Sequence, residues 1–289
     1  NNLLLAHNGE FYDYQRIRAR LTSQNARFAT KSDSEIILHL FPRLGMDETL
    51  KELRGEFAFS LYNKEEEALY LVRDRFGIKP LYWTQVGDTI IFGSELKVLF
   101  AHPEVKPEFT SEGLYHQLIQ TMVPGTTAFK NVHQVKPGHV VRIKRQGGKL
   151  VVNEHKYWDL NFPREIERKE MSEEEAINRT REELLNAVAL RLEADVPVGS
   201  YLSGGIDSCA IIGLASACRQ GPVRAFTIGF DDKDYDETPI ATQMAESCGA
   251  EQDVMRLSGD ELYGHFEETL WHTERTIYNT LAVAKLLMS

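Results

Sequence analysis

The hydrophobic pattern of the chain changes near its middle, and this change constrains the fold more than any other feature. In the second half, short apolar runs alternate with segments of helical periodicity. Strands are expected at residues 198–202, 225–228 and 253–257, and helices at residues 208–218, 240–248, 261–271 and 281–288. Strands separated by helices pair in parallel, because the connection must cross one face of the sheet. The second half is therefore predicted to be an α/β domain with a doubly wound parallel sheet.

The first half instead has the pattern of antiparallel β-structure. Hairpins are expected where residues 57–62 precede 68–72, 81–83 precede 90–92, and 139–145 precede 150–153. An apolar run at residues 3–6 adds a strand, and helices are expected at residues 13–21 and 36–44. Ser32 or Asp33 can serve as the N-cap of the second helix. This half is predicted to be an α+β domain of antiparallel sheets.

A polar segment at residues 161–171, which includes Pro163, separates the two patterns. Behind it, Ser172 and Glu175 have the spacing of a capping box, and apolar residues at helical spacing follow. We therefore predict a first domain at residues 1–160, a linker at residues 161–171 and a second domain at residues 172–289.

Composition narrows the classes of partner and compartment. The formal net charge is -10 and no run of lysine or arginine occurs, which argues against a nucleic-acid partner. The three cysteines show no CxxC spacing, which argues against a disulfide framework and a structural zinc site. No apolar stretch reaches the roughly 18 residues of a membrane-spanning helix. We expect a cytoplasmic protein with no membrane partner.

Residues 201–208, Tyr-Leu-Ser-Gly-Gly-Ile-Asp-Ser, are the strongest local signal of a binding site. They follow an apolar strand and open a helix, so unpaired N–H groups and the positive end of the helix dipole face the loop. Gly204 and Gly205 let the backbone approach a ligand closely, and Ser203 and Ser208 add hydroxyl donors. This combination is typical of a phosphate site at the carboxyl end of a parallel strand.

From spacing alone, this loop has two interpretations. The lysine and the spacing of a Walker A loop are absent, so the loop need not hold a transferring γ-phosphate. Asp207 is unusual beside an anion unless a cation is present, and Mg²⁺ held by one carboxylate and phosphate oxygens resolves the conflict. The alternative is a tight turn that only starts a helix.

The run Ser-Gly-Gly-Ile-Asp-Ser resembles the PP-loop of the ATP pyrophosphatases, which cleave ATP between its α- and β-phosphates. The resemblance implies that residues 203–208 hold pyrophosphate, that Asp207 binds Mg²⁺, and that Leu202 and Ile228 contact adenine. The acidic residues 231–237 resemble the family's loop after the next strand. Without the resemblance, Ile228 is explained as a core residue and the acidic run as a solvated loop.

Four short motifs of the first half acquire meaning only together. They are Asn8-Gly9-Glu10, Asp33 within residues 31–35, residues 73–82 and residues 93–97. Each has an ordinary explanation by itself, because Asn-Gly pairs favour turns and Asp33 suits a helix N-cap. In this order and spacing they resemble the class II glutamine amidotransferase domain, whose fold is of the N-terminal nucleophile type.

In that family a cysteine at the N-terminus attacks the glutamine amide, and its own α-amine acts as the base. The resemblance implies that Asn8 and the N–H of Gly9 form an oxyanion hole, where two donors meet the developing negative charge. It also implies that Glu10 and Asp33 hold the glutamine, with the carboxylate of Asp33 facing the α-amino group.

The chain departs from that family at its beginning. Family members carry the nucleophilic cysteine and a glutamine-binding arginine before the position of Asn8, whereas no cysteine here precedes Cys209. Cys209 lies at the start of a helix and is better explained as a small packing residue than as a substitute nucleophile. We expect a fragment that lacks residues at both ends, and one unable by itself to hydrolyse glutamine by the family's mechanism. The apolar helix at residues 281–288 agrees, since it would be left partly exposed.

A glutaminase domain followed by a PP-loop domain is specific to the asparagine synthetase superfamily. The resemblance implies that glutamine yields ammonia, that ATP adenylates the side-chain carboxylate of aspartate, and that ammonia carried through a tunnel displaces AMP. The substrates are then glutamine, aspartate and ATP with Mg²⁺, and the expected oligomer is a homodimer. Two alternatives stay open, namely a related amidotransferase acting on another carboxylate and a non-catalytic derivative of the fold. A β-lactam synthetase-like cyclase uses no glutamine and would leave the front motifs unexplained.

Overall fold

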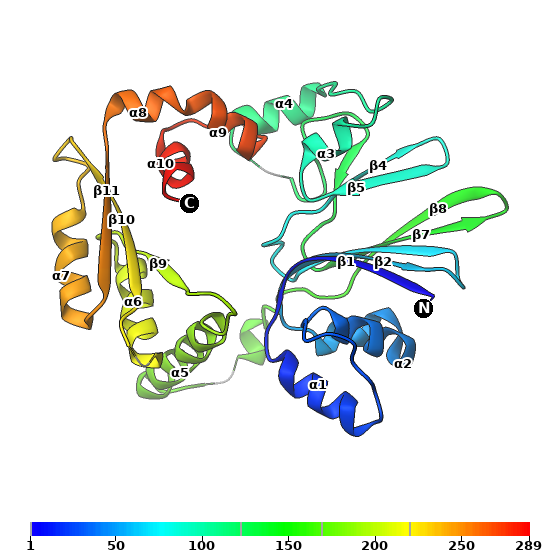
Figure 1. Cartoon of the computed structure of the whole chain (residues 1–289), viewed down its shortest axis with the longest axis horizontal. Coiled ribbons are helices and arrows are strands. Elements are labelled where there is room, and N and C mark those ends of the chain that lie inside the picture. Colours follow the sequence, from blue (N-terminus) through cyan, green and yellow to red (C-terminus); the bar gives the residue numbers. More distant parts are fainter. Residues whose placement is uncertain (1, 122, 169, 220) are drawn as a thin grey trace. The chain divides into compact units, whose positions relative to one another are not determined.

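The structure is a computed structural model that describes residues 2–121, 123–168, 170–219 and 221–289. The chain divides into two compact units, Asn1–Phe162 and Pro163–Ser289, and each is described by itself (Figure 1). The short 3-10 helix η1, Glu165–Glu167, lies within the segment predicted to be a linker. None of the helices in the described part of the chain is long and apolar enough to cross a bilayer.

The first unit is built on two antiparallel sheets, as predicted from its hairpin pattern. Their strand orders are β1-β2-β3-β7-β8 and β5-β4-β6. The strands are β1 Leu3–Phe11, β2 Gly55–Asn63, β3 Ala68–Arg73, β4 Tyr82–Val86, β5 Thr89–Gly93, β6 Val132–Gln134, β7 His139–Gln146 and β8 Lys149–Lys156. All three predicted hairpins form, as the pairs β2–β3, β4–β5 and β7–β8.

The first unit has the layers helix, sheet, sheet and helix. Its helices are α1 Tyr14–Ser23, α2 Glu35–Glu52, α3 Leu96–Phe100 and α4 Ser111–Leu118. One face of the five-stranded sheet packs on α1 and α2 through a core that includes Ile17, Leu40 and Phe59. The other face packs on the three-stranded sheet, and α3 packs on the far side of that second sheet. Helices α3 and α4 and strand β6 were not predicted, because elements this short carry too little periodicity.

Strand β1 is longer than predicted and contains the Asn8-Gly9-Glu10 motif. The apolar run ends at Ala6, but the strand continues to Phe11, and Gly9 pairs with Phe57 of β2. Gly9 has φ 126°, a backbone conformation that L side chains rarely adopt. The Asn-Gly pair therefore stays in the ladder because its glycine accepts an unusual strand geometry, and no turn forms.

The second unit contains a parallel sheet of three strands, which confirms the predicted α/β fold. The strands are β9 Gly199–Tyr201, β10 Arg224–Phe230 and β11 Glu251–Leu257, and β10 pairs in parallel with both neighbours. The helices are α5 Glu173–Arg191, α6 Ile206–Cys218, α7 Thr238–Cys248, α8 Gly259–Gly264, α9 Phe266–Thr273 and α10 Leu281–Met288. The single helix predicted at residues 261–271 is broken between α8 and α9 at His265, which follows Gly264 and has non-helical φ −102° and ψ 12°.

Helices cover both faces of this parallel sheet. On one face, Val188 of α5, Ile212 of α6 and Ala241 of α7 share a buried cluster. On the other face, Leu257 of β11 packs with Val283 of α10. The segment between β9 and α6 is thus held at the carboxyl end of a parallel strand, where ligands of α/β folds bind (Figure 1).

Candidate functional site

In the first unit, β1 presents the front motif at the edge of the five-stranded sheet. Asn8 is exposed, and its Nδ2 donates a hydrogen bond to Oγ of Ser94 at 3.3 Å. Ser94 belongs to the motif at residues 93–97, so two of the four separate motifs meet in space. The exposed amide of Asn8 is available as a donor to a ligand on this face.

Gly9 is fixed by a very close approach of β2. A Cβ built on Gly9 would lie 1.9 Å from the carbonyl oxygen of Glu56, far inside any real contact. Both this contact and the positive φ require glycine, so the peptide orientation at the predicted oxyanion donor depends on this residue type.

Asp33 lies beside the same stretch of β1, which is not where a helix cap would place it. Helix α2 begins at Glu35 with Ser34 in the cap position, so the predicted N-cap role of Ser32 or Asp33 is wrong. Instead, Oδ2 of Asp33 accepts from the N–H of Phe11 at 2.7 Å, and Oδ1 accepts from the N–H of Ser34 at 2.7 Å. The hydroxyls of Ser34 and Ser32 add longer contacts to Oδ1 at 3.2 and 3.4 Å. Two short backbone bonds therefore orient the carboxylate, and two longer hydroxyl contacts add to them.

His7 joins this group, although no sequence motif distinguishes it from other histidines. Its Nδ1 lies 2.7 Å from Oγ of Ser34, which connects His7 to Asp33 through one hydroxyl. Burial lowers the pKa of His7, against a raising effect of the Asp33 charge. The ring stacks on Phe11 with its centroid at 4.5 Å, and its Nε2 is a buried atom with no partner among the described residues.

The motif at residues 73–82 has a structural role in the same unit. Asp74 is fully buried, and its two oxygens accept backbone N–H groups at 3.0–3.3 Å from Phe57, Phe76, Ile78 and Lys79. Arg73 donates to the carbonyl oxygens of Gly77, Lys79 and Val135. These two side chains tie the turn after β3 to β2, which carries Glu56 and Phe57 against the front motif.

In the second unit, the loop of residues 203–208 forms the turn predicted between β9 and α6. Its own hydroxyls bond its backbone, since the N–H of Ser203 donates to Oγ of Ser208 at 3.1 Å and the N–H of Gly205 donates to Oγ of Ser203 at 3.2 Å. Oγ of Ser208 also lies 3.0 Å from the carbonyl oxygen of Gly205. The loop is therefore closed by local bonds between serines at either end.

The helix that follows this loop begins without a side-chain cap. Gly205 occupies the N-cap position of α6, so the N-cap residue has no side chain to cap the helix. Ile206 and Asp207 are exposed in the first turn. The N–H groups of such a turn are suited to an anion. Cys209 is part of the same turn, and its thiol points to the carbonyl oxygen of Ser203 at 3.6 Å, which agrees with a packing role.

The single carboxylate of Asp207 fits a Mg²⁺ site in which most of the metal ligands come from phosphate and water. Within the described residues, no group of three or more His, Cys, Asp or Glu side chains could hold a metal ion. A metal bound mainly by the phosphates of its nucleotide and by water needs only one or two protein carboxylates. The exposed carboxylate of Asp207, at the start of α6, suits that arrangement and not a cage of protein ligands.

Leu202 and Ile228, the two predicted adenine contacts, lie on opposite faces of the parallel sheet. Leu202 is 2% exposed and packs with Ile212 of α6 and Ala225 of β10. Ile228 is half-buried and packs with the cluster around Leu257. The side chain of Leu202 is thus part of the core. The adenine contacts of Leu202 and Ile228 stay predictions.

Glu237 contacts the loop of residues 203–208. The acidic run that contains it is visible in the sequence, but Glu237 was not predicted as a site residue. Its Oε2 accepts the N–H of Gly204 at 2.9 Å, across 33 positions of sequence. In the sequence it is one of several acids in the run 231–237, and nothing in that run distinguishes it from its solvated neighbours. Only the packing of α7 against the loop identifies it.

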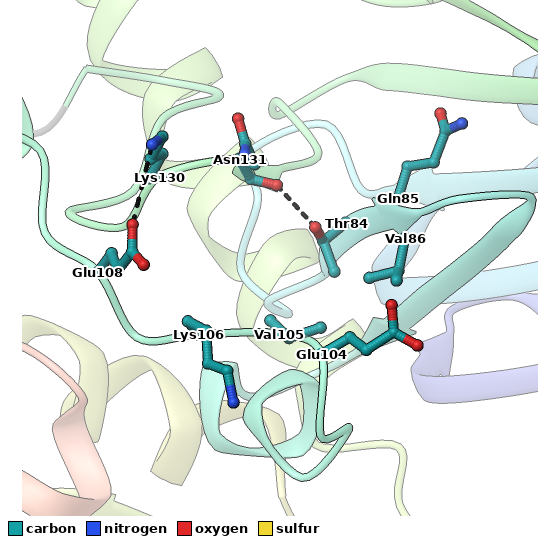
Figure 2. Close-up of a pocket in the computed structure, with 9 residues that line it drawn as sticks. All are labelled: Thr84, Gln85, Val86, Glu104, Val105, Lys106, Glu108, Lys130 and Asn131. Atoms are coloured by element: carbon teal, nitrogen blue, oxygen red, sulfur yellow. Dashed lines mark hydrogen bonds and ion pairs between the residues drawn. The ribbon is translucent and has the colours of Figure 1, made fainter.

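A hollow in the first unit is lined by none of the residues predicted to bind glutamine or ATP. Figure 2 shows its lining, which comprises Thr84, Gln85, Val86, Glu104, Val105, Lys106, Glu108, Lys130 and Asn131. Its hydroxyl at Thr84 is already bonded to the carbonyl oxygen of Asn131, and Lys130 lies 3.8 Å from Glu108. Because its lining holds two lysines and two glutamates, this hollow offers no net charge for a phosphate or a carboxylate.

Comparison with known proteins identifies both halves of the chain. The glutamine amidotransferase domain family matches residues 1–158, and the asparagine synthase family matches residues 179–289. Asparagine synthetase [glutamine-hydrolyzing] 1 of Bacillus subtilis is 32% identical over 96% of this chain. The chain belongs to the glutamine-hydrolysing asparagine synthetase family.

Two relatives with a different kind of name are also similar to the chain. Amidase chry2 of Gibberella zeae is 34% identical over 98% of the chain, and Amidase chyE of Penicillium rubens is 35% identical over 100% of it. The chain spans 43% and 44% of the length of these two relatives, and 42% of the Bacillus protein. The family resemblance expected from the sequence motifs is thereby confirmed.

Proposed function

We propose that this chain is part of a glutamine-dependent, ATP-consuming amide synthetase that converts aspartate to asparagine. The observation that carries the proposal is the loop at residues 203–208, which stands between a parallel strand and an uncapped helix start in a domain of the asparagine synthase family. Such a loop suits the pyrophosphate that leaves when ATP transfers AMP to a carboxylate.

The first unit would release ammonia from glutamine. In this proposal the amide of Asn8 and the N–H of Gly9 stabilise the oxyanion that forms when the glutamine amide is attacked. The carboxylate of Asp33, fixed by two short backbone bonds, receives the α-ammonium group in exchange for its longer hydroxyl contacts. Glu10 is exposed on the same side of β1 as Asn8 and completes the contact with glutamine.

The second unit would activate the acceptor carboxylate. A carboxylate is a poor acyl donor, and its adenylate has AMP as a good leaving group for ammonia. Residues 203–208 would hold the β- and γ-phosphates, with Leu202 and Ile228 next to the adenine. Mg²⁺ at Asp207 would neutralise phosphate charge, while the N–H groups at the start of α6 orient the departing pyrophosphate.

A second candidate acceptor has its own support. The two fungal relatives are named amidases and share 34% and 35% identity with the chain, against 32% for the Bacillus asparagine synthetase. In this alternative the same glutaminase and adenylation chemistry acts on a carboxylate other than that of aspartate.

Pyrophosphate release tests both candidates in the intact protein. The assay contains ATP, Mg²⁺, glutamine and aspartate, and each component is left out in turn. Release that requires aspartate and yields asparagine supports the first candidate. Formation of glutamate without aspartate-dependent pyrophosphate points to another acceptor. If neither glutamate nor pyrophosphate forms, the synthetase proposal is wrong.

A further inference from the structure

One contact in the second unit connects the loop at residues 203–208 to a different helix. The N–H of Gly204 donates to Oε2 of Glu237 at 2.9 Å, and Glu237 directly precedes the first residue of α7. The neighbouring N–H groups of Ser203 and Gly205 are bonded by hydroxyls of the loop itself. The Gly204 bond therefore holds the loop to a residue outside it.

Helix α7 also packs tightly on this glycine. A Cβ built on Gly204 would lie 3.2 Å from Cβ of Glu237 and 3.2 Å from Cβ of Ile240. Both distances are tighter than most real Cβ contacts, so the start of α7 lies directly against the backbone of this glycine. The bond to Glu237 and this packing restrict the same peptide unit.

The position of Glu237 is itself anchored from both sides. The preceding Asp236 accepts bonds from the N–H and the hydroxyl of Thr238, and its Oδ2 lies 3.5 Å from Nη1 of Arg256. Thr238 is buried and packs against the end of β10, where a Cβ built on Gly229 would lie 2.9 Å from its Oγ1. Since contacts to the sheet hold the residues on either side of Glu237, its backbone is placed so that its exposed carboxylate reaches the loop.

We propose that Glu237 is a positioning residue of the nucleotide loop. By holding the N–H of Gly204 away from the anion, Glu237 assigns the phosphate contact to the N–H groups at the start of α6. This inference rests on the proposed function, because it assumes that the loop receives a phosphate. Glu237 lies outside residues 203–208, so it is an additional residue of the site. Its role requires an acceptor oxygen at that position but not a negative charge.

The test compares binding of MgATP to three variants of the full protein by titration calorimetry, after thermal melts show that each is folded. Glu237→Ala removes the acceptor and is expected to raise the Kd about tenfold, as the loss of one hydrogen bond would. Glu237→Gln keeps an acceptor oxygen and is expected to stay within about threefold of the parent Kd. Glu246→Ala, an exposed carboxylate near the other end of α7, is the matched control and is expected to change nothing.

Each other outcome overturns the inference. Tighter binding by both Glu237 variants would mean that Glu237 occupies the phosphate position and must be displaced. Equal weakening by Glu237→Ala and Glu237→Gln would mean that the charge matters and not the acceptor. Unchanged binding by both would mean that the contact has no role in the loop.

Amide hydrogen exchange of residues 203–208 tests the inference without nucleotide, and so distinguishes its failure from a failure of the proposed function. Without nucleotide, Glu237→Ala is expected to speed exchange in this segment about tenfold, whereas Glu237→Gln and Glu246→Ala are not. If the parent protein binds no MgATP but exchange behaves this way, the proposed function fails, and of the inference only the restraint of the loop by Glu237 stands. If exchange in the segment is the same in all proteins, the positioning role fails whatever the nucleotide does.

Discussion

The two predicted sites of this chain are built in different ways. At the front site, Asn8, Ser94 and Asp33 come from three segments, and the strand that carries Asn8 is locked into a sheet. At the nucleotide loop, Ser203, Gly205 and Ser208 bond to one another within six consecutive residues, and Glu237 supplies a contact from the start of α7. A site assembled from a sheet depends on the fold as a whole, whereas a local loop can change its binding without unfolding its domain.

The largest effect that this comparison predicts is at Gly9. Gly9→Ala places a methyl group 1.9 Å from a backbone carbonyl oxygen at φ 126°, so β1 must separate from β2. We expect the free energy of unfolding to fall by about 3 kcal/mol or more, measured by urea denaturation.

A glycine with a positive φ but open surroundings shows what a positive φ costs without a collision. Gly147 has φ 55° with no atom within 4 Å of a built Cβ, and Gly147→Ala is expected to cost only about 1 kcal/mol. Equal losses at Gly9 and Gly147 would show that β2 yields at the front site, and the contrast between a rigid and an adaptable site would then fail.

The same difference explains what the sequence could predict. The loop at residues 203–208 is contiguous and follows an apolar strand, so its place at a helix start and the parallel sheet could be predicted from local pattern alone. The hairpins of the first unit followed from alternation and turn residues in the same way. Asn8, Asp33 and Ser94 gave no such local signal, since their meeting depends on pairing between strands far apart in sequence.

The failures of prediction have the same cause. The extension of β1 through Gly9 depends on its pairing with β2. There the carbonyl of Glu56, which is 47 positions later in the sequence, lies against Gly9. Asp33 was assigned as a helix cap because its local sequence allows it, but the backbone of Phe11 competes for its carboxylate. Glu237 could not be told from other acids in its run. In each case a tertiary contact overrode a reasonable local preference.

The second prediction concerns acid stability of the segment that carries Asp33. Burial of Glu35 opposes its ionisation, but hydrogen bonds from Thr30 and from the N–H of Ala29 outweigh it and lower its pKa to about 2. Because this folded pKa lies below the ordinary glutamate value of 4.5, the unfolded state binds the proton more readily. The stabilisation is therefore complete above pH 4.5 and is lost as the pH falls towards 2.

Glu35→Gln tests this in urea melts at several pH values. The parent protein is expected to be more stable than the variant at neutral pH, with the difference shrinking between pH 4.5 and 2. Glu104→Gln, at an exposed carboxylate of the same unit, serves as the control and is expected to show no such convergence. A constant difference between Glu35→Gln and the parent across this range would contradict the assignment.

The smallest effect on stability, and the one that best sharpens the comparison, is expected at Ser208. Its hydroxyl accepts from the N–H of Ser203 and lies within bonding distance of the carbonyl oxygen of Gly205, so Ser208→Ala opens the loop. We expect about 1 kcal/mol or less in the free energy of unfolding but about a tenfold rise in the Kd of MgATP. Ser216→Ala on the same helix is the control, because the Ser216 hydroxyl has no hydrogen-bond partner among the described residues. If Ser208→Ala instead lowers the stability as much as Gly9→Ala does, the loop is part of the domain's core framework and the two sites do not differ in kind.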